Sequence, residues 1–175
     1  SLVVSGQLYD NLLPICAELG HVPVLGNKRP CGCGALGCLE TLVSTRGLLQ
    51  SFAAAHGGLV PTWEFMIETL AIRGVEPWLA TTLDATSVVI AGALNVLGVR
   101  TVVVTGSLPD LPTAVMAHLS SAIRRGSIYA RFGQIDIETA PRHRTAGLVA
   151  AGIDRLVVPM SNRDPAARGV ASSSA

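Results

Sequence analysis

Three cysteines and one histidine lie close together near the start of the chain, and all four are residue types that bind metals. His21, Cys31, Cys33 and Cys38 form the pattern His-x9-Cys-x-Cys-x4-Cys, with glycines between the thiols. Glycine allows the backbone to turn tightly enough to aim three sulfurs at one point. Three thiolates and one imidazole make a tetrahedral set typical of structural zinc, with no position left for a reactive water. We therefore expect a structural Zn2+ at these four residues.

Other states of the same cysteines are consistent with the spacing. The thiols can stay reduced and metal-free, or Cys31 and Cys38 can form a disulfide beside an ordinary loop histidine. Four candidate ligands within eighteen residues favour the metal. Crowded thiols also argue against a framework of disulfides and indicate a reducing compartment, so a cytoplasmic location is expected. Cys16 lies outside the pattern and is expected to be a small buried hydrophobe.

Two carboxylates flank the same cluster. Glu18 precedes His21 by three residues and Glu40 follows Cys38 by two, so a metal there would draw both toward one place. Carboxylates accept strong hydrogen bonds from hydroxyl groups, which makes a sugar an obvious ligand. His21 can serve both sets, with one ring nitrogen on the metal and the other offered to the ligand. The alternative is that Glu40 complements a helix dipole and Glu18 is simply solvated.

The composition limits the other classes of function. A chain of 175 residues is long enough for one domain with a sizeable core. Charged residues make up 14% and the net charge is +1, so no basic surface for nucleic acid is evident. A surface so poor in charge is expected to bury part of itself against another lobe or subunit. The uncharged stretch from Ala85 to Val99 is too short to span a membrane, and no signal-peptide pattern is present, so no membrane partner is expected.

Strands and helices are expected to alternate along most of the chain. Helices are predicted over residues 39–56, from Pro61 to about Gly74, and over 76–97, 113–125 and 145–157. Strands are predicted over 2–10 as a hairpin, 21–25, 100–106 as a buried run, and 134–140. This order predicts a layered α/β fold with a mostly parallel or mixed sheet. The small polar residues 159–175 are expected to form a mobile tail.

Two motifs resemble those of a known family. The segment "ELGH" at 18–21 resembles the Glu-x-Gly-His signature of the ROK family of repressors, open reading frames and kinases. "CGCGALGCLE" at 31–40 resembles the family's Cys-x-Cys-Gly-x-x-Gly-Cys-x-Glu zinc motif. Weaker similarity continues through "VVVTGSLP" and "TAGLVAAGIDRL". The resemblance implies that residues 1–158 form the carboxy-terminal lobe of an actin-like, ribonuclease H-like sugar-kinase architecture, with a mixed sheet, flanking helices and a zinc-stapled loop.

The resemblance also implies roles for individual residues. His21 and the three cysteines match the structural zinc ligands of the family, while Glu18, His21 and Glu40 match positions that contact sugar hydroxyls. Kinases of the family usually carry paired glycines after the strand equivalent to residues 101–104, where nucleotide contacts form. This chain has the single Gly106 there, which resembles the N-acetylglucosamine repressor branch and leaves only a weak cofactor-binding position. Ala17 stands where a glycine is common.

Two further motifs that the resemblance implies are absent. The family's Asp-x-Gly-x-Thr phosphate loop and its Asn-Asp pair with the catalytic base are not found, and "LDATS" at 83–87 has the pattern of a mid-helix segment rather than a phosphate loop. We therefore expect a chain that lacks its amino-terminal lobe and that transfers no phosphate by itself.

Three functions are consistent with these observations. The first is a sugar-sensing transcriptional regulator, in which this lobe binds a sugar or sugar phosphate and forms a homodimer, with DNA contacted only by a segment outside this chain. The second is an ATP- and Mg2+-dependent kinase of a hexose or N-acetylhexosamine. The third is a zinc-stapled dimerisation module without a ligand. The regulator is favoured by the metal and glutamate cluster combined with the single glycine at Gly106.

Overall fold

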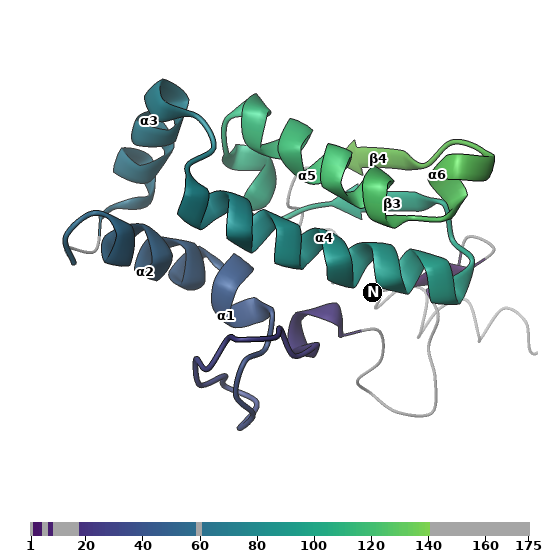
Figure 1. Ribbon diagram of the computed structural model, residues 1–175, viewed down its shortest axis with the longest axis horizontal. Helices are drawn as coiled ribbons and strands as arrows, with labels where there is room; N and C mark the ends of the chain where they lie inside the picture. Colours follow the sequence, from purple (N-terminus) through teal and green to yellow (C-terminus); the bar gives the residue numbers. More distant parts are fainter. Residues whose placement is uncertain (1, 5–6, 9–17, 59–60, 141–175) are drawn as a thin grey trace, which may run out of the picture. The chain divides into compact units, whose positions relative to one another are not determined.

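A computed structural model describes residues 2–4, 7–8, 18–58 and 61–140 (Figure 1). The chain divides into two units, residues 1–140 and 141–175. The helix expected at 145–157, the tail expected at 159–175 and Cys16 all lie outside the described residues. All the described residues belong to the first unit.

Helices make up most of this unit. The α-helices are α1 (Glu40–Val43), α2 (Thr45–Ala55), α3 (Trp63–Arg73), α4 (Pro77–Leu97), α5 (Thr113–Gly126) and α6 (Tyr129–Phe132), and the 3-10 helices are η1 (Leu19–His21) and η2 (Leu108–Asp110). The limits of α3 and α4 agree closely with the sequence prediction. Thr62 begins α3 by accepting a hydrogen bond from the backbone N–H of Phe65, and Gly74 ends it.

The longest helix, α4, is the centre of the packing. Pro77 occupies its first turn, and Gly98 ends it in the left-handed conformation, with its N–H bonded to Leu94 O at 3.0 Å. By length and composition alone α4 could cross a membrane. Leu79 and Leu83 on it are nevertheless fully buried in the core, and α4 packs against α5 and α2 (Figure 1). Core packing therefore accounts for the apolar residues of its buried face, while Val88 and Val96 are exposed.

The core is made by apolar side chains from several helices and from the segment before the last strand. Its buried members are Leu48, Phe52, Met66, Leu70, Leu79, Leu83, Leu94, Leu111, Val115, Leu119, Ile123 and Ile135. Each of these residues is at most 4% exposed, which means that α2, α3, α4 and α5 share one core.

The described strands form two separate pairs. Strands β1 (Val3–Val4) and β2 (Gln7–Leu8) are antiparallel, as the expected hairpin requires. Strands β3 (Thr101–Val104) and β4 (Asp136–Thr139) are parallel. The parallel pair agrees with an α/β fold, but the described strands do not join into one mixed sheet.

The strand predicted over residues 100–106 as a buried run is a parallel strand, but it is buried on one face only. Val104 is buried, but Val103 is 54% exposed. Successive side chains of a strand point to opposite faces, so only one face of β3 packs on the core of the described residues.

The single helix expected over residues 39–56 is interrupted at Ser44. This residue is extended, with ψ 157°, and its side chain accepts a hydrogen bond from Gly47 N at 3.2 Å, which caps the start of α2. The backbones of Gly47 and Thr41 lie so close that a Cβ at position 47 would collide with Thr41 O. The break separates α1, which carries Glu40, from α2. The strand expected over 21–25 is reduced to one bridge between Pro23 and Cys38.

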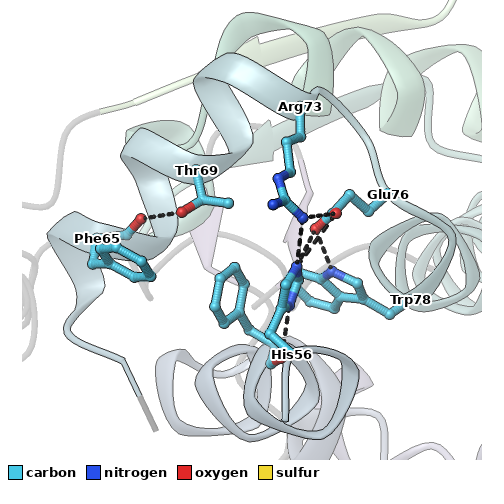
Figure 2. A network of polar contacts seen from close by, with 7 residues as sticks. His56, Phe65, Thr69, Arg73, Glu76 and Trp78 are labelled. Atoms are coloured by element: carbon cyan, nitrogen blue, oxygen red, sulfur yellow. Dashed lines mark hydrogen bonds and ion pairs between the residues drawn. The ribbon is translucent and has the colours of Figure 1, made fainter. Parts of the chain in front are cut away.

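A polar network joins α2, α3 and α4 (Figure 2). His56 Nε2 lies 3.1 Å from a carboxylate oxygen of Glu76, and Arg73 and the indole N–H of Trp78 also bond to Glu76. Partial burial opposes ionisation of Glu76, but these bonds and the charge of His56 outweigh it and lower the pKa of the carboxyl. The His56 ring stacks on Phe52, with centroids 4.0 Å apart. The network fixes the helix junctions near the core.

Candidate zinc and sugar site

The segment from His21 to Cys38, called the zinc loop here, is folded back on itself by two isolated β-bridges. Val24 N donates to Gly37 O at 2.8 Å, and the bridges pair Pro23 with Cys38 and Pro30 with Leu36. Gly37 has φ +79°, and a Cβ on it would lie 2.5 Å from Asn27 O. Only glycine fits this position, because both the dihedral angle and the space exclude a side chain.

The fold brings the four predicted metal ligands together. The ligand atoms of His21, Cys31, Cys33 and Cys38 all lie within 4.8 Å of one another, and the three cysteines are free thiols. Cys31 Sγ is 3.6 Å from His21 Nδ1, and Cys33 Sγ is 3.6 Å from Cys38 Sγ. A tetrahedral site with Zn–S bonds of about 2.3 Å separates its sulfurs by about 3.8 Å. The donor set and its spacing therefore fit a zinc ion.

The environments of the thiols differ. Cys38 is buried, and burial raises the pKa of its thiol to about 12, with Cys33 and Cys31 adding to the effect. The exposed thiol of Cys33 has a lowered pKa because it accepts a hydrogen bond from the Ala35 backbone and contacts the other two thiols. If all three thiols lost their protons to bind a metal, a divalent cation would compensate most of the charge of the resulting thiolates.

Glu40 lies directly beside the cluster of His21, Cys31, Cys33 and Cys38. It is the first residue of α1, and its Oε2 is 3.7 Å from His21 Nδ1 and 3.6 Å from Cys31 Sγ. A Cβ at Gly20 would lie 3.5 Å from Glu40 Cβ, so the η1 turn packs against this residue. The side chains of His21 and Glu40 are 38% and 54% exposed, which leaves both open to a ligand. The structure therefore brings together two of the three predicted sugar contacts.

Glu18, the third predicted contact, is exposed at the start of η1. Its carbonyl oxygen accepts a hydrogen bond from His21 N at 3.0 Å, so the two residues belong to one turn. Within the described residues, the Glu18 carboxylate forms no ion pair.

Two residues of the zinc loop that sequence reasoning missed connect it to the helices. Asn27 Nδ2 donates to Cys38 O at 3.2 Å and to Thr41 Oγ1 at 2.9 Å. Arg29 Nη1 donates to Thr41 O at 3.0 Å and to Gly47 O at 3.2 Å. The signal in the sequence was the segment "NKRP" just before Cys31. Polar side chains in a tight loop can donate hydrogen bonds to backbone carbonyls that would otherwise lack a partner.

A groove of about 430 Å³ opens beside Glu40, between the zinc loop and the start of α2. Its size is in the range of small-molecule sites. The polar residues that line it are Arg29, Glu40, Thr41, Ser44, Arg46 and Gln50.

Gly106 follows β3 and has φ +92°, as a tight turn requires. The next residue, Ser107, is joined to Thr45 at the start of α2 by a hydroxyl contact of 2.9 Å. The predicted cofactor position therefore lies close to the first turn of α2. The segment Leu83–Ser87 lies within α4, as expected of residues that do not form a phosphate loop.

Comparisons with known proteins agree with these features. The chain is 28% identical over 155 residues to an N-acetyl-D-glucosamine kinase of Yersinia pseudotuberculosis, which covers 75% of this chain and 50% of the kinase. The fold is similar to that of a ROK hexokinase from Thermus thermophilus, with a TM-score of 0.63 and 23% identity over 82% of this chain and 49% of the hexokinase. It is equally similar, at 20% identity and a TM-score of 0.63, to a ROK family transcriptional regulator homologous to the E. coli Mlc protein, covering 82% of this chain and 39% of that one.

The chain thus spans about half the length of the relatives that it matches. The structural likeness confirms a mixed α/β fold of the sugar-kinase type, while the relatives include both kinases and a regulator. The ROK family model matches residues 2–153, which include both the His21 turn and the cysteine motif. This chain belongs to the ROK family.

Proposed function

We propose that this chain is the zinc-containing, sugar-binding lobe of a sugar-sensing transcriptional regulator of the ROK family. The observation that carries the sugar-binding part is the placement of Glu40 Oε2 beside His21 Nδ1 and Cys31 Sγ, at the edge of an open groove. Carboxylate oxygens accept hydrogen bonds from neighbouring hydroxyls of a sugar ring. Glu18 adds a second carboxylate from the same turn as His21.

The orientation of His21 supports a double role for this residue. Its Nδ1 faces Cys31 and the metal cluster, which leaves Nε2 for a sugar hydroxyl. When bound, zinc would hold the imidazole in one orientation and fix the zinc loop. The zinc ion is therefore proposed to shape the sugar site without touching the sugar.

For the whole protein, the turn at Gly106 supports the regulator. In the segment "TGSLP" the strand is followed by the single Gly106, and this single glycine in the sequence resembles the N-acetylglucosamine repressor branch. We expect a cytoplasmic homodimer whose DNA-binding segment lies outside this chain. Sugar or sugar phosphate would change the geometry of that dimer.

A kinase is the second candidate, because three quarters of this chain is similar to the N-acetyl-D-glucosamine kinase of Yersinia pseudotuberculosis. In that case Glu18, His21 and Glu40 would orient an N-acetylhexosamine or hexose. The catalytic base and most contacts to ATP and Mg2+ would come from residues outside this chain.

One assay separates the two candidates. The full-length protein is incubated with ATP, Mg2+ and a panel of hexoses and N-acetylhexosamines, and ADP release is measured. The regulator predicts no sugar-dependent release, together with sugar-dependent binding of the protein to its own promoter DNA. Sugar-dependent ADP release at enzymatic rates, without DNA binding, would contradict the regulator hypothesis and support the kinase hypothesis.

A further inference from the structure

The three thiols of the zinc loop differ in their exposure to solvent and in what they contact. Cys33 is exposed, Cys31 is half-buried and Cys38 is buried. Cys33 Sγ lies 3.6 Å from Cys38 Sγ. The described contacts of Cys31 Sγ lead instead to His21 Nδ1 and Glu40 Oε2, each at 3.6 Å. The structure thus pairs one accessible thiol with one buried thiol and leaves the third beside the proposed sugar contacts.

We propose that Cys33 is a redox modification site, at which a peroxide starts the formation of a disulfide with Cys38 and the metal ion leaves the zinc loop. Loss of the ion then weakens ligand binding at Glu40. This last part rests on the proposed function, whereas the disulfide and the loss of metal do not. Cytosolic disulfides are mostly transient and serve catalysis or redox sensing, so the switch agrees with the reducing compartment expected from the crowded thiols.

The backbone on either side of Cys33 leaves room for its sulfur to move. A Cβ added at Gly32 or at Gly34 would meet no atom within 4 Å. A disulfide bond is about 2.05 Å long, so the two sulfurs must approach each other by roughly 1.5 Å. Glycines on both sides provide the backbone freedom for such a shift. The segment around Cys33 can therefore close onto Cys38 without displacing a packed side chain.

Cys38, by contrast, is held in place at the end of the zinc loop. It is 1% exposed. Its carbonyl oxygen accepts hydrogen bonds from Asn27 Nδ2 at 3.2 Å and from Thr41 N at 3.1 Å. Oxidation of thiols follows their exposure, so an oxidant reaches Cys33 first. Cys38 is then the neighbouring thiol that resolves the oxidised sulfur.

The oxidant is a peroxide, and hydrogen peroxide is the simplest example. The sulfur of Cys33 attacks one peroxide oxygen, the O–O bond breaks, a sulfenic acid forms and the other oxygen leaves as hydroxide. The sulfur of Cys38 then attacks the sulfenic sulfur, the S–O bond breaks, the S–S bond forms and a second hydroxide leaves. Each sulfur loses one electron, and the two hydroxides take up solvent protons to become water.

The disulfide takes away two of the four metal ligands. Its sulfurs carry no negative charge, so only His21 and Cys31 remain, whereas a structural zinc site has four ligands. Metal binding is coupled to local folding, so loss of the ion also frees the His21 ring, whose Nδ1 lies 3.7 Å from Glu40 Oε2. A dithiol reduces the disulfide and restores both thiols, which makes the change reversible.

The test is peroxide treatment of the full zinc-loaded chain carrying Cys16→Ser, in which every remaining cysteine belongs to the cluster. A chromophoric chelator follows zinc release, and mass spectrometry of proteolytic fragments maps the cysteine pairs. We expect zinc release and the disulfide between Cys33 and Cys38 to appear at the same rate, and dithiothreitol with added zinc to reverse both. Retention of zinc, a disulfide that uses Cys31, or zinc release with only sulfinic acid at Cys33 would overturn the proposal.

The variant Cys33→His tests whether Cys33 starts the reaction. It keeps the number of protein ligands, in a set of two cysteines and two histidines that also binds zinc, but it has no thiol at the exposed position. We expect peroxide to release its zinc at least roughly tenfold more slowly than in the parent. Release at the parent's rate would show that another thiol is attacked first.

Calorimetric titration with N-acetylglucosamine and glucose, before and after peroxide, separates this inference from the proposed function. We expect oxidation to weaken sugar binding roughly tenfold or more, and reduction with added zinc to restore it. Equal affinity in the two states would overturn the control of the sugar site by oxidation. If the reduced chain binds no sugar but still loses zinc as the disulfide forms, the sugar-binding function fails and the redox site is supported.

Discussion

The guanidinium of Arg29 donates to the backbone oxygen of Gly47 at 3.2 Å, which bonds the zinc loop directly to the first turn of α2. The same Nη1 reaches Thr41 O in α1. One side chain thus connects the zinc loop, the helix that carries Glu40 and the start of α2. We therefore expect both zinc binding and sugar binding to depend on the hydrogen bonds that Arg29 makes to Thr41 O and Gly47 O.

Replacement of Arg29 by methionine should destabilise the protein. Met keeps much of the aliphatic volume but leaves Thr41 O and Gly47 O without their charged donor. Loss of such bonds is expected to lower the free energy of unfolding by about 2 kcal/mol. Urea denaturation measures the change, with Arg125→Met on α5 as the control expected within about 0.5 kcal/mol of the parent. Equal stability of the two variants would show that the Arg29 bonds contribute nothing.

Gly37 should not tolerate alanine. The new Cβ would lie 2.5 Å from Asn27 O, in a conformation with φ +79° that disfavours any side chain. We expect Gly37→Ala to lower the free energy of unfolding by about 2 to 3 kcal/mol or more. Gly92→Ala in the exposed part of α4, where no atom lies within 4 Å, should instead be neutral or stabilise by up to about 1 kcal/mol. Thermal denaturation of both variants gives the comparison.

Removal of one metal ligand should release the ion. Cys33→Ser replaces a thiolate by a hydroxyl that binds zinc poorly, and metal binding is coupled to the folding of the zinc loop. Elemental analysis after gel filtration should find about one zinc per chain in the parent and a strongly reduced content in the variant. Cys16→Ser, outside the ligand pattern, is the matched control and should keep its zinc. Full zinc content in Cys33→Ser would contradict the four-ligand assignment.

The polar network at Glu76 should make part of the stability depend on pH. The folded state lowers the pKa of the Glu76 carboxyl. The ionised carboxylate therefore stabilises the folded protein fully above the unfolded pKa of about 4.3. This stabilisation is lost as the pH falls through the lower pKa of the folded state. The stability difference between the parent and Glu76→Gln should therefore shrink in acid below about pH 4.3. Urea denaturation from pH 7 to pH 3 measures it.

Glu68→Gln is the control for that series, because Glu68 is exposed on α3 and should change the free energy of unfolding by less than about 0.5 kcal/mol. A stability difference for Glu76→Gln that stays constant down to pH 3 would contradict the lowered pKa.

Local patterns in the sequence predicted the helices well where their end signals were strong. Pro77 at the start of α4 and Gly98 at its end mark the limits that the structure has. The break at Ser44 was missed because the apolar spacing runs continuously from Leu39 to Phe52. The capping signal of Ser44 was present, but a serine inside a periodic segment looks the same whether it caps a helix or not.

The grouping of His21, Cys31, Cys33 and Cys38 could be predicted because one histidine and three cysteines at this spacing are typical of a single metal site. The contacts of Arg29 could not, since they depend on backbone carbonyls that α1 and α2 supply. Exposure of Val103 was missed for a related reason, because the burial of a strand depends on what covers it rather than on its own residues.

The central claim is that Glu40, beside the metal cluster, binds sugar hydroxyls. Calorimetric titration of the zinc-loaded chain with N-acetylglucosamine and glucose tests it most directly, in the parent, in Glu40→Gln and in the control Glu138→Gln on β4. We predict binding of at least one sugar, weakened roughly tenfold or more in Glu40→Gln with zinc retained, and unchanged in the control. Equal sugar affinity in all three proteins, or no binding by the zinc-loaded parent, would contradict the claim.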